Sequence, residues 1–535
     1  MSATAAASTA PVAGARPRLP TWLALAVLVL LAAGLRLSTL GLQSFWYDEA
    51  FTPVHVLHGS LGATLRAMVR TENTPPLWYV IEWVDVRVLG TGEVALRLPS
   101  ALAGIATVPV AWAIGGELGG RRAALVAAAF VAVNPLFVWY SQEARAYALF
   151  VLTAALAMLC FLRAEREPTR ARMVAFALSG SLALLTHYFA LFLLIPMILW
   201  LARERITRRA ALPALGVLAI VGLALLPLIS SQGGHGTQWI GRWALSGRLE
   251  AIPQYYLTGY SGAPLGHAVE LLVALPIVAG LALALWRVVD RSPPSSAHAA
   301  PGGDPAPAAS RARRSRHAAP ARDGAPRGAQ IAFLIAAGGI LIPIVLALFG
   351  ADYLAPRNLV AAMIPVTGLI AVMLTSPQAG RMGIALAATT AVAFLALSID
   401  VNLSPRLQRG NWRAVARALR GQAGEHVITT VELGAAPLEY YLPGLRNLAL
   451  GTSVTVGEID ETGYAPLRAS AGRTPAPGFR LLERLDLDGL LVYRFVSPAP
   501  RAVSEAALRR HVITLAHPEV LVPPHAHVTF TPAPG

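Results

Sequence analysis

Residues 147–162 read YALFVLTAALAMLCFL and lead directly into the arginine-rich segment 163–172, RAEREPTRAR. A bilayer-crossing helix needs about 20 mostly apolar residues, and this run is close to that length once its flanks are included. Backbone groups in lipid must be satisfied within the segment, so the run is predicted to be helical. Arginines at the end of a span mark its cytoplasmic side. The stretch therefore predicts a transmembrane helix that ends on the inner face.

The same pattern recurs along the chain. The 535 residues are 55% hydrophobic and only 14% charged, with a mean hydropathy of +0.55. A soluble protein of this size is less apolar. Further apolar runs occupy residues 21–34, 123–138, 212–229, 268–286, 331–349 and 384–399. We expect a polytopic α-helical membrane protein with about 11 transmembrane helices.

The positive charge follows the membrane pattern rather than that of a nucleic-acid-binding protein. The net charge of +15 is concentrated in residues 163–172, 203–209 and 311–327, each of which lies between apolar runs. Basic residues interleaved with aromatics in a groove-sized domain are absent from the sequence, so nucleic acid is not expected as a partner. The single cysteine, Cys160, lies inside an apolar run, so the chain is expected to fold without disulfides.

The arginine clusters also predict which loops face outward. With the clusters inside, Asp48 and Glu49 lie outside, and an odd number of crossings must separate them from the inner pair Arg121 and Arg122. Two segments compete for that crossing, 76–89 and 97–113. The first carries Glu82, Asp85 and Arg87, which are costly at membrane depth. We therefore expect 76–89 to lie on the outer face, anchored by Trp78, Tyr79 and Trp83.

This assignment gives eleven spans with a cytoplasmic N-terminus. The first apolar run follows Arg16 and Arg18 but no small-residue cleavage site comes after it, so it is expected to be an uncleaved helix. We expect a multi-pass protein of the cytoplasmic (inner) membrane, in contact with membrane lipids.

Three parts of the chain are expected. Residues 1–205 form an N-terminal membrane module with a first outer loop at 41–96. Residues 206–400 form further helices around a linker, 290–328, whose Pro, Ala, Ser and Arg content indicates a disordered cytoplasmic segment, solvated or touching anionic lipid. Residues 401–535 are predicted to form a small extracytoplasmic α/β domain. There a helical stripe of Trp412, Val415, Ala416 and Leu419 precedes strand-like 427–431, a short helix at 437–442 and strand-like 490–496.

Polar side chains gather on the predicted outer loops. Asp48 and Glu49 can act as a general base, as a metal-ligand pair or only as solvated loop residues, and spacing alone favours the last. The 140–147 segment and Arg357 could instead only snorkel to the membrane interface. His187 could instead be a histidine at a helix turn whose hydrogen bonds are satisfied there. The remaining candidates for substrate binding are Glu72, Gln142, Glu143, Arg145, Tyr147, His187 and Arg357.

Several of these stretches together resemble a known family. They are 44–49 (SFWYDE), 75–79 (PPLWY), 97–104 (RLPSALAG) and 140–149 (YSQEARAYAL). They are similar to the bacterial dolichyl-phosphate-mannose protein mannosyltransferase-like glycosyltransferases, which share the GT-C fold with the lipid A aminoarabinose transferases. The resemblance covers residues 20–205 well. Thr74 and Asn358 depart from it, since relatives often carry His and Tyr at these places.

The resemblance implies transfer of a sugar from a polyprenyl-phosphate carrier to an acceptor on the outer face, with inversion at the anomeric carbon. The family's catalytic acid in the first loop matches Asp48, which would take the acceptor proton. Arg145 and Arg357 are candidates for binding the phosphate. Glu49 is expected to orient the acceptor or to help Asp48 hold a divalent metal ion.

Two other functions remain open at this point. Polar residues within spans also mark transporters and lipid flippases, although these gather on one face. A non-catalytic assembly protein that binds envelope glycan is the other alternative. Protein, polysaccharide and glycolipid are all compatible as acceptor. The outer loop 230–264 is either an aromatic wall for that acceptor or an interfacial belt. Asp486 with Asp488 is expected to form a turn, and His525 with His527 is a weak metal signal.

Overall fold

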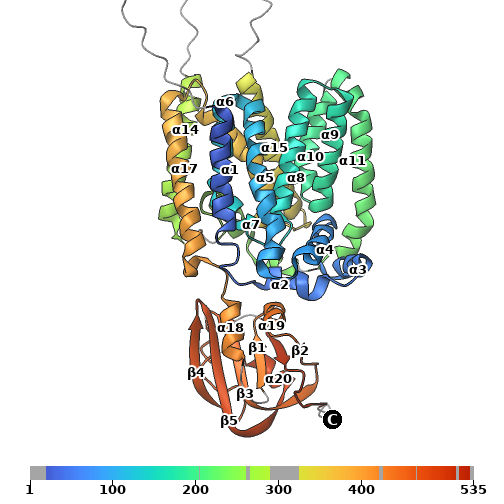
Figure 1. Ribbon diagram of the computed structural model, residues 1–535, viewed down its shortest axis with the longest axis vertical. Coiled ribbons are helices and arrows are strands. Elements are labelled where there is room, and N and C mark those ends of the chain that lie inside the picture. The colour runs from blue at the N-terminus through green and yellow to red at the C-terminus, as the bar shows by residue number, and fades with distance from the viewer. Residues whose placement is uncertain are drawn as a thin grey trace, which may run out of the picture.

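The structure is a computed structural model in which a bundle of helices carries a smaller α/β domain at one end (Figure 1). It describes residues 20–203, 205–235, 237–260, 265–289, 324–420, 426–465, 467–511, 513 and 517–530. Arg16, Arg18 and most of the expected linker lie outside these residues. The end of that linker, 324–328, belongs to helix α15 rather than to a disordered segment.

The bundle contains most of the helices. Its first half comprises α1 (Thr21–Leu37), α2 (Tyr47–Phe51), the π-helix η1 (Thr52–Val56), α3 (Leu61–Thr71), α4 (Leu77–Leu89), α5 (Glu93–Gly119), α6 (Arg121–Val133), α7 (Pro135–Ser141), α8 (Tyr147–Arg166), α9 (Arg170–Thr186) and α10 (Ala190–Arg203). Its second half comprises α11 (Arg205–Gln232), α12 (Gln238–Arg242), α13 (Leu245–Thr258), α14 (His267–Val289), α15 (Gly324–Leu348), the 3-10 helix η3 (Pro356–Ala362), α16 (Met363–Leu374) and α17 (Gly380–Leu403).

Within the described residues, seven helices are long and apolar enough to cross a membrane, or eight if the bent pair α6–α7 counts as one span. Two shorter apolar helices, α1 and α10, accompany them. Long apolar helices can cross a lipid bilayer because their backbone hydrogen bonds are all made within the helix. The chain is therefore a multi-pass membrane protein.

The run expected at 123–138 is not one straight helix. It bends by 54° between α6 and α7. Pro135 cannot continue the backbone bonding of α6, and it begins α7 instead. The Asn134 side chain caps α7 by accepting from Leu136 N at 3.0 Å and donates to Tyr256 O at 2.7 Å. The polar segment after Ser141 contacts Arg409, in the chain that leads into the C-terminal α/β domain (the soluble domain, residues 401–535).

Helix α4 lies at the end of the bundle nearest that domain, beside α3 (Figure 1). Trp78 and Tyr79 were expected to anchor it at the lipid interface, and that expectation is wrong. Both side chains are about 1% exposed and pack inside the protein with Val56, Met68 and Ala146. The aromatic rings therefore hold α4 to its neighbouring helices.

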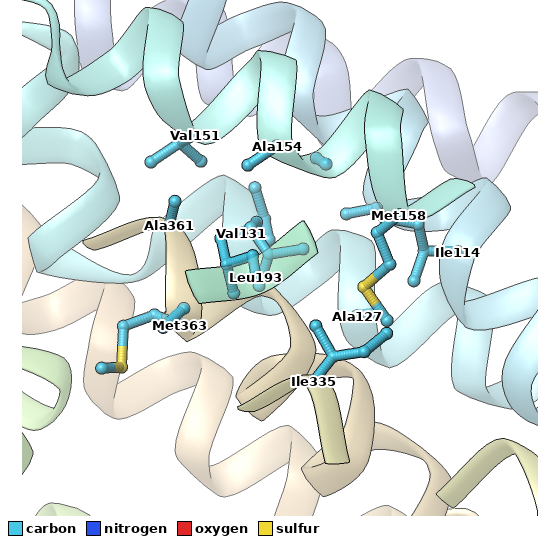
Figure 2. Packing of buried hydrophobic residues seen from close by; sticks show 14 of the residues in the cluster. Ile114, Ala127, Val131, Val151, Ala154, Met158, Leu193, Ile335, Ala361 and Met363 are labelled. Atoms are coloured by element: carbon cyan, nitrogen blue, oxygen red, sulfur yellow. The ribbon is translucent and has the colours of Figure 1, made fainter. Parts of the chain in front are cut away.

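The bundle interior is packed with small and branched side chains. Figure 2 shows Val151, Ala154 and Met158 of α8 close to Val131 and Ala127 of α6. Alanines on facing helices let the backbones approach closely, which favours helix association in membranes. This core holds α5, α6 and α8 together, and all three lead to the polar segments described below.

The soluble domain is built on one mixed sheet. Its strands are β1 (His426–Thr430), β2 (Arg446–Asn447), β3 (Thr452–Tyr464), β4 (Arg480–Leu487), β5 (Leu490–Ser504), β6 (Glu519–Val522) and β7 (Val528–Phe530). The order is β2-β6-β1-β3-β5-β4, with β7 beside β3. Strands β1 and β3 run parallel and the other pairs are antiparallel.

Helices cover the sheet and connect it to the bundle. They are η4 (Pro405–Leu407), α18 (Trp412–Leu419), α19 (Ala435–Tyr441) and α20 (Glu505–Arg510). The predicted stripe Trp412, Val415, Ala416 and Leu419 is buried in α18, as expected from its spacing. The acid pair at 486–488 is a hairpin turn: Asp488 has φ 57° and Gly489 N donates to Asp486 Oδ1 at 3.0 Å. An α/β domain at the C-terminus is therefore confirmed.

Candidate active site

Asp48 and Arg357 form an ion pair at the end of the bundle that faces the soluble domain. Asp48 lies in the first turn of α2, and Arg357 follows Pro356 at the start of η3. Arg357 Nη1 donates to Asp48 Oδ2 at 2.6 Å, and the guanidinium lies 4.8 Å from the centre of the Trp239 ring. The two side chains are 24% and 15% exposed. This pair is therefore accessible to a ligand.

No other described residue accepts a hydrogen bond from Arg357. A guanidinium has five N–H donors arranged to match a carboxylate or a phosphate. The side chain can therefore bind a second anion without losing its contact with Asp48.

Arg145 has a different environment. Its Nη1 and Nη2 donate to Glu72 Oε1 and Oε2 at 3.2 and 3.0 Å, a bidentate pair. Longer contacts of 3.4 Å reach Asp48 O and Thr52 Oγ1. Burial disfavours the charged form of Arg145, but Glu72 more than compensates and the pKa of Arg145 is raised. Most of its donors are used, which ties the 142–146 segment to the start of the loop before α4.

Glu49 points into the protein although it is adjacent to Asp48. Its two oxygens accept from Arg97 Nε and Nη2 at 2.7 Å each, and Oε1 also accepts from Ala144 N at 3.0 Å. Both side chains are essentially unexposed. Burial alone raises the pKa of Glu49, but Arg97 and Arg409 outweigh it and hold that pKa below its usual range. Glu49 is thus an internal anion.

Arg97 extends this internal contact to the loop between α1 and α2. Its remaining donors reach Leu40 O, Gln43 O and Ser44 O at 2.9, 2.8 and 3.1 Å. Arg97 lies near the start of α5, so it fixes the loop that carries Asp48 to a long helix of the bundle.

Glu143 is buried next to this group and is paired with an arginine from the other end of the chain. Arg409 Nη2 donates to Glu143 Oε2 at 2.9 Å, while Glu143 Oε1 has no hydrogen-bond partner among the described residues. Burial raises the pKa of Glu143 to about 7, against the opposing charge of Arg409. This carboxyl therefore changes charge near neutral pH.

Gln142 serves the end of α1 rather than an open site. Its Nε2 contacts Leu35 O, Arg36 O and Thr39 Oγ1 at 2.9, 3.2 and 2.7 Å. Leu35 O and Arg36 O lie in the last turn of α1, where carbonyls have no partner within the helix. Gln142 is only 3% exposed, and its contacts hold the end of α7 against the end of α1.

Tyr147, at the start of α8, and His187, at the end of α9, lie close together. The Tyr147 ring centre is 4.8 Å from that of Tyr140 and 6.2 Å from that of His187. The His187 ring stacks on Phe150 at 4.6 Å, and its Nδ1 accepts from Phe189 N at 3.2 Å. His187 therefore behaves as a helix-end residue inside an aromatic cluster.

The described residues do not fit a metal site. They contain no group of three or more His, Cys, Asp or Glu side chains arranged to hold an ion. Glu49, one of the two expected ligands, already has both oxygens bonded to Arg97. Asp48 has Arg357 in contact instead of a second acid.

Arg97 and Arg409 are parts of this site that the sequence did not single out. Arg97 lies inside the quoted 97–104 stretch, and an arginine in the first turns of an apolar helix is a usable signal. Arg409 has no such signal, because it lies between α17 and α18 and reaches Glu143 across 266 residues.

One stretch of the bundle matches a known protein family. Residues 73–230 match the family described as dolichyl-phosphate-mannose-protein mannosyltransferase. No curated protein matches the chain.

Among solved structures, ArnT from Cupriavidus metallidurans bound to undecaprenyl phosphate shares 12% identity at a TM-score of 0.49, with 88% of this chain and 98% of that chain covered. The Archaeoglobus fulgidus oligosaccharyltransferase in complex with Zn and sulfate shares 16% identity at a TM-score of 0.42, with coverages of 78% and 57%. The resemblance that the sequence predicts is confirmed by the family match over residues 73–230.

Proposed function

We propose that the protein is an inverting glycosyltransferase of the GT-C type, which transfers a sugar from a polyprenyl-phosphate carrier to an acceptor on the outer face of the cytoplasmic membrane. The observation that carries the proposal is the accessible Asp48–Arg357 pair. In it, a carboxylate that can act as a base lies 2.6 Å, from Oδ2 to Nη1, from an arginine that can bind phosphate. The family match supports it, because the matched residues 73–230 include Glu143 and Arg145.

The reaction needs one base and one anion-binding group. Asp48 removes the proton from the acceptor hydroxyl as that oxygen attacks the anomeric carbon from the face opposite the phosphate. The new glycosidic bond forms as the bond from the anomeric carbon to the phosphate oxygen breaks, and the polyprenyl phosphate leaves with the electron pair. The proton stays on Asp48, and the configuration at carbon is inverted.

Arg357 is the residue we assign to the leaving phosphate. Its unused donors can bind two phosphate oxygens while Nη1 keeps its contact with Asp48. Charge already present where charge develops lowers the barrier, because no reorganisation is needed during the reaction. Arg145 is a second candidate for this role, although Glu72 uses both of its terminal nitrogens in this structure.

Glu49 and Arg97 then act by position. Their buried pair fixes the start of α2, so that Asp48 faces Arg357 while Glu49 faces the interior. Glu72, Gln142, Tyr147 and His187 keep the surrounding loops in place. Neither Asp48 nor Glu49 is assigned to a metal here.

The membrane arrangement belongs to the same proposal. Helices α1, α9 and α10, added to the seven long helices and the bent pair α6–α7, make eleven spans. We propose a cytoplasmic N-terminus and an extracytoplasmic soluble domain, with boundaries near residues 205 and 400. The basic ends of α8, α9 and α10 and the loop carrying Asp48 lie at opposite ends of the bundle in Figure 1, as this orientation requires.

Transfer from labelled polyprenyl-phosphate sugars is the direct test. Purified wild type and Asp48→Asn would receive a panel of labelled donors, with membrane extract as acceptor. We expect the wild type to transfer label and Asp48→Asn to lose about 10²- to 10⁴-fold in rate. Asp400→Asn is the matched control, since Asp400 is exposed at the end of α17 and is expected to leave the rate unchanged.

Each outcome separates the proposal from its alternatives. A folded wild type that consumes no donor, while lipid still moves between leaflets in vesicles, indicates a flippase. Full transfer by Asp48→Asn rejects Asp48 as the base. Binding of envelope glycan by wild type and Asp48→Asn alike, without transfer, indicates an assembly protein.

A further inference from the structure

We propose that Arg409 is a positioning residue which the soluble domain contributes to the site. It fixes Glu143 so that Glu143 Oε1 is presented as the acceptor for a hydroxyl group of a sugar ring in the substrate. The inference rests on the proposed function and adds to it the residues that recognise the sugar.

The first observation is the unpartnered oxygen of Glu143. The side chain is 1% exposed, Oε2 is held by Arg409 at 2.9 Å, and Oε1 has no hydrogen-bond partner among the described residues. A buried acceptor left without a donor is costly, so native structures usually provide one. Sugar hydroxyls are donors of the right kind, and the site lies next to Asp48, whose charge acts on Glu143.

The second observation is how firmly Arg409 is held. Its guanidinium lies 4.0 Å from the Trp139 ring centre and 5.7 Å from that of Trp46, a position that favours cation–π attraction. Its backbone N donates to Gln43 Oε1 at 3.2 Å. The side chain is only 2% exposed. Arg409 is therefore part of the interior of the site and not a surface contact.

The third observation is that the segment around Arg409 also joins the soluble domain to the first outer loop. Ser44 Oγ donates to Gly410 O at 3.0 Å and accepts from Trp412 N at 3.0 Å. Arg409 Nε lies 3.8 Å from Glu49 Oε2. The segment 409–412 therefore both docks the soluble domain on the loop before α2 and orients Glu143.

One exposed aromatic ring near Glu143, backed by two buried tryptophans, suits a sugar ring. Tyr260 is 37% exposed, and its ring centre lies 5.7 Å from that of Trp139 and 6.3 Å from that of Trp46. Exposed aromatic faces stack on the apolar faces of sugars, while a carboxylate accepts from their hydroxyls. Either the transferred sugar or a sugar on the acceptor has this chemistry.

The test compares Arg409→Gln, Arg409→Lys and Glu143→Gln with Arg413→Gln as the matched control. Arg413 also joins the soluble domain to the first outer loop, through Glu93, but does not contact Glu143. We expect Arg409→Gln and Glu143→Gln to raise the KM of one substrate about tenfold to hundredfold, with a smaller effect on kcat. Arg409→Lys should recover part of this loss, and Arg413→Gln should leave KM unchanged.

The pH profile separates positioning from general structural support. The groups that face Glu143 are Arg409 from the segment before α18, Asp48 and Glu49 of α2, Arg357 of η3, and tyrosines 140, 147 and 260. The ionised Glu143 accepts the hydroxyl, so kcat/KM should fall as pH drops below about 7. Arg409 lowers this pKa, so Arg409→Gln should move the acidic limb to higher pH, and Glu143→Gln should remove it.

Donor and acceptor are distinguished by whose KM changes, and by sugar release to water without acceptor, which requires only donor binding. Equal losses of kcat in Arg409→Gln and Arg413→Gln, with no pH shift, would overturn the inference. So would an unchanged KM and acidic limb in Glu143→Gln. Failure of the wild type to transfer any sugar would instead overturn the proposed function.

Discussion

The arginine–acid pairs of the helical bundle differ in how deeply they are buried. Near the soluble domain, Arg97 with Glu49 and Arg409 with Glu143 are at most 2% exposed. At the other end, Arg166 and Arg163 of α8 are 59% and 50% exposed where they reach Glu117 of α5. Burial decides the role: exposed pairs contribute little to stability and mark a membrane side, while buried pairs are costly to break.

A second contrast lies between two neighbouring acids at the end of the bundle near the soluble domain. Asp48 and Glu49 are neighbours in α2, yet one faces an accessible arginine and the other an enclosed one. Successive residues on a helix point about 100° apart, so adjacent acids can serve different surroundings. The comparison predicts that the loss of Glu49 affects stability first and the loss of Asp48 affects the reaction first.

The largest expected effect on stability comes from breaking the buried pair. Arg97→Gln should destabilise the protein by about 3–5 kcal/mol, because it leaves Glu49 charged and enclosed. The same substitution also removes three bonds to backbone carbonyls of the loop between α1 and α2. Thermal or denaturant unfolding in detergent would measure it. A change below about 1 kcal/mol would show that the pair does not hold the loop.

Glu82→Gln is the matched control for that experiment. Glu82 of α4 is also unexposed, but both its oxygens lack a hydrogen-bond partner in the described part of the chain, and burial raises its pKa well above its usual range. The folded protein therefore holds this proton to higher pH than the unfolded chain. Wild-type stability should fall as pH rises above the unfolded pKa, whereas Glu82→Gln should lose this dependence and be at least as stable at pH 8.

Arg357→Gln tests the accessible pair. It should lower kcat by about 10²- to 10³-fold, the usual effect of removing one group that stabilises developing charge. Arg357→Lys keeps the charge without the planar donors, so it should recover only part of the rate. Arg242→Gln is a suitable control, because Arg242 is 52% exposed where it meets Glu432. Equal rates in Arg357→Gln and wild type would remove Arg357 from the phosphate site.

Local patterns in the sequence were enough to predict much of this architecture. Apolar runs and arginine clusters depend on a few neighbouring residues, and they predicted the multiple spans. The same held for α18 and β1, whose stripe and strand pattern lie within short windows. The outward position of Asp48 stays a prediction. The bend at Asn134 was missed, although Pro135 is the residue that ends α6.

Partners far apart in the chain could not be predicted in the same way. Glu49 meets Arg97 across 48 residues and Glu143 meets Arg409 across 266. No periodicity or spacing records such contacts, so Glu49 was expected at the acceptor or a metal. The direction of a side chain in a short helix depends on packing that only the folded chain supplies.

Gly104→Ala should cause a loss of stability between that of Arg97→Gln and that of Arg166→Gln. A Cβ at this position of α5 would lie 1.9 Å from Ser141 Oγ and 2.9 Å from Arg36 Nε. That serine accepts from Arg36 Nε at 3.0 Å, so the methyl group would displace a buried arginine contact. Overpacking of this kind costs about 1–3 kcal/mol. Gly216→Ala, which meets nothing within 4 Å, should show no such loss in the same unfolding measurement.

Arg166→Gln should have the smallest effect on stability, because Arg166 is 59% exposed in its pair with Glu117. The Arg166 Nη1–Glu117 Oε2 distance is a short 2.6 Å, so distance alone would suggest a strong interaction. Water screens both charges and the long side chain loses freedom in pairing, which leaves about 0–1 kcal/mol. Unfolding in detergent at low and high salt would measure the difference. A loss above about 2 kcal/mol would show that exposure does not separate the two ends, and that close ion pairs stabilise this protein wherever they lie.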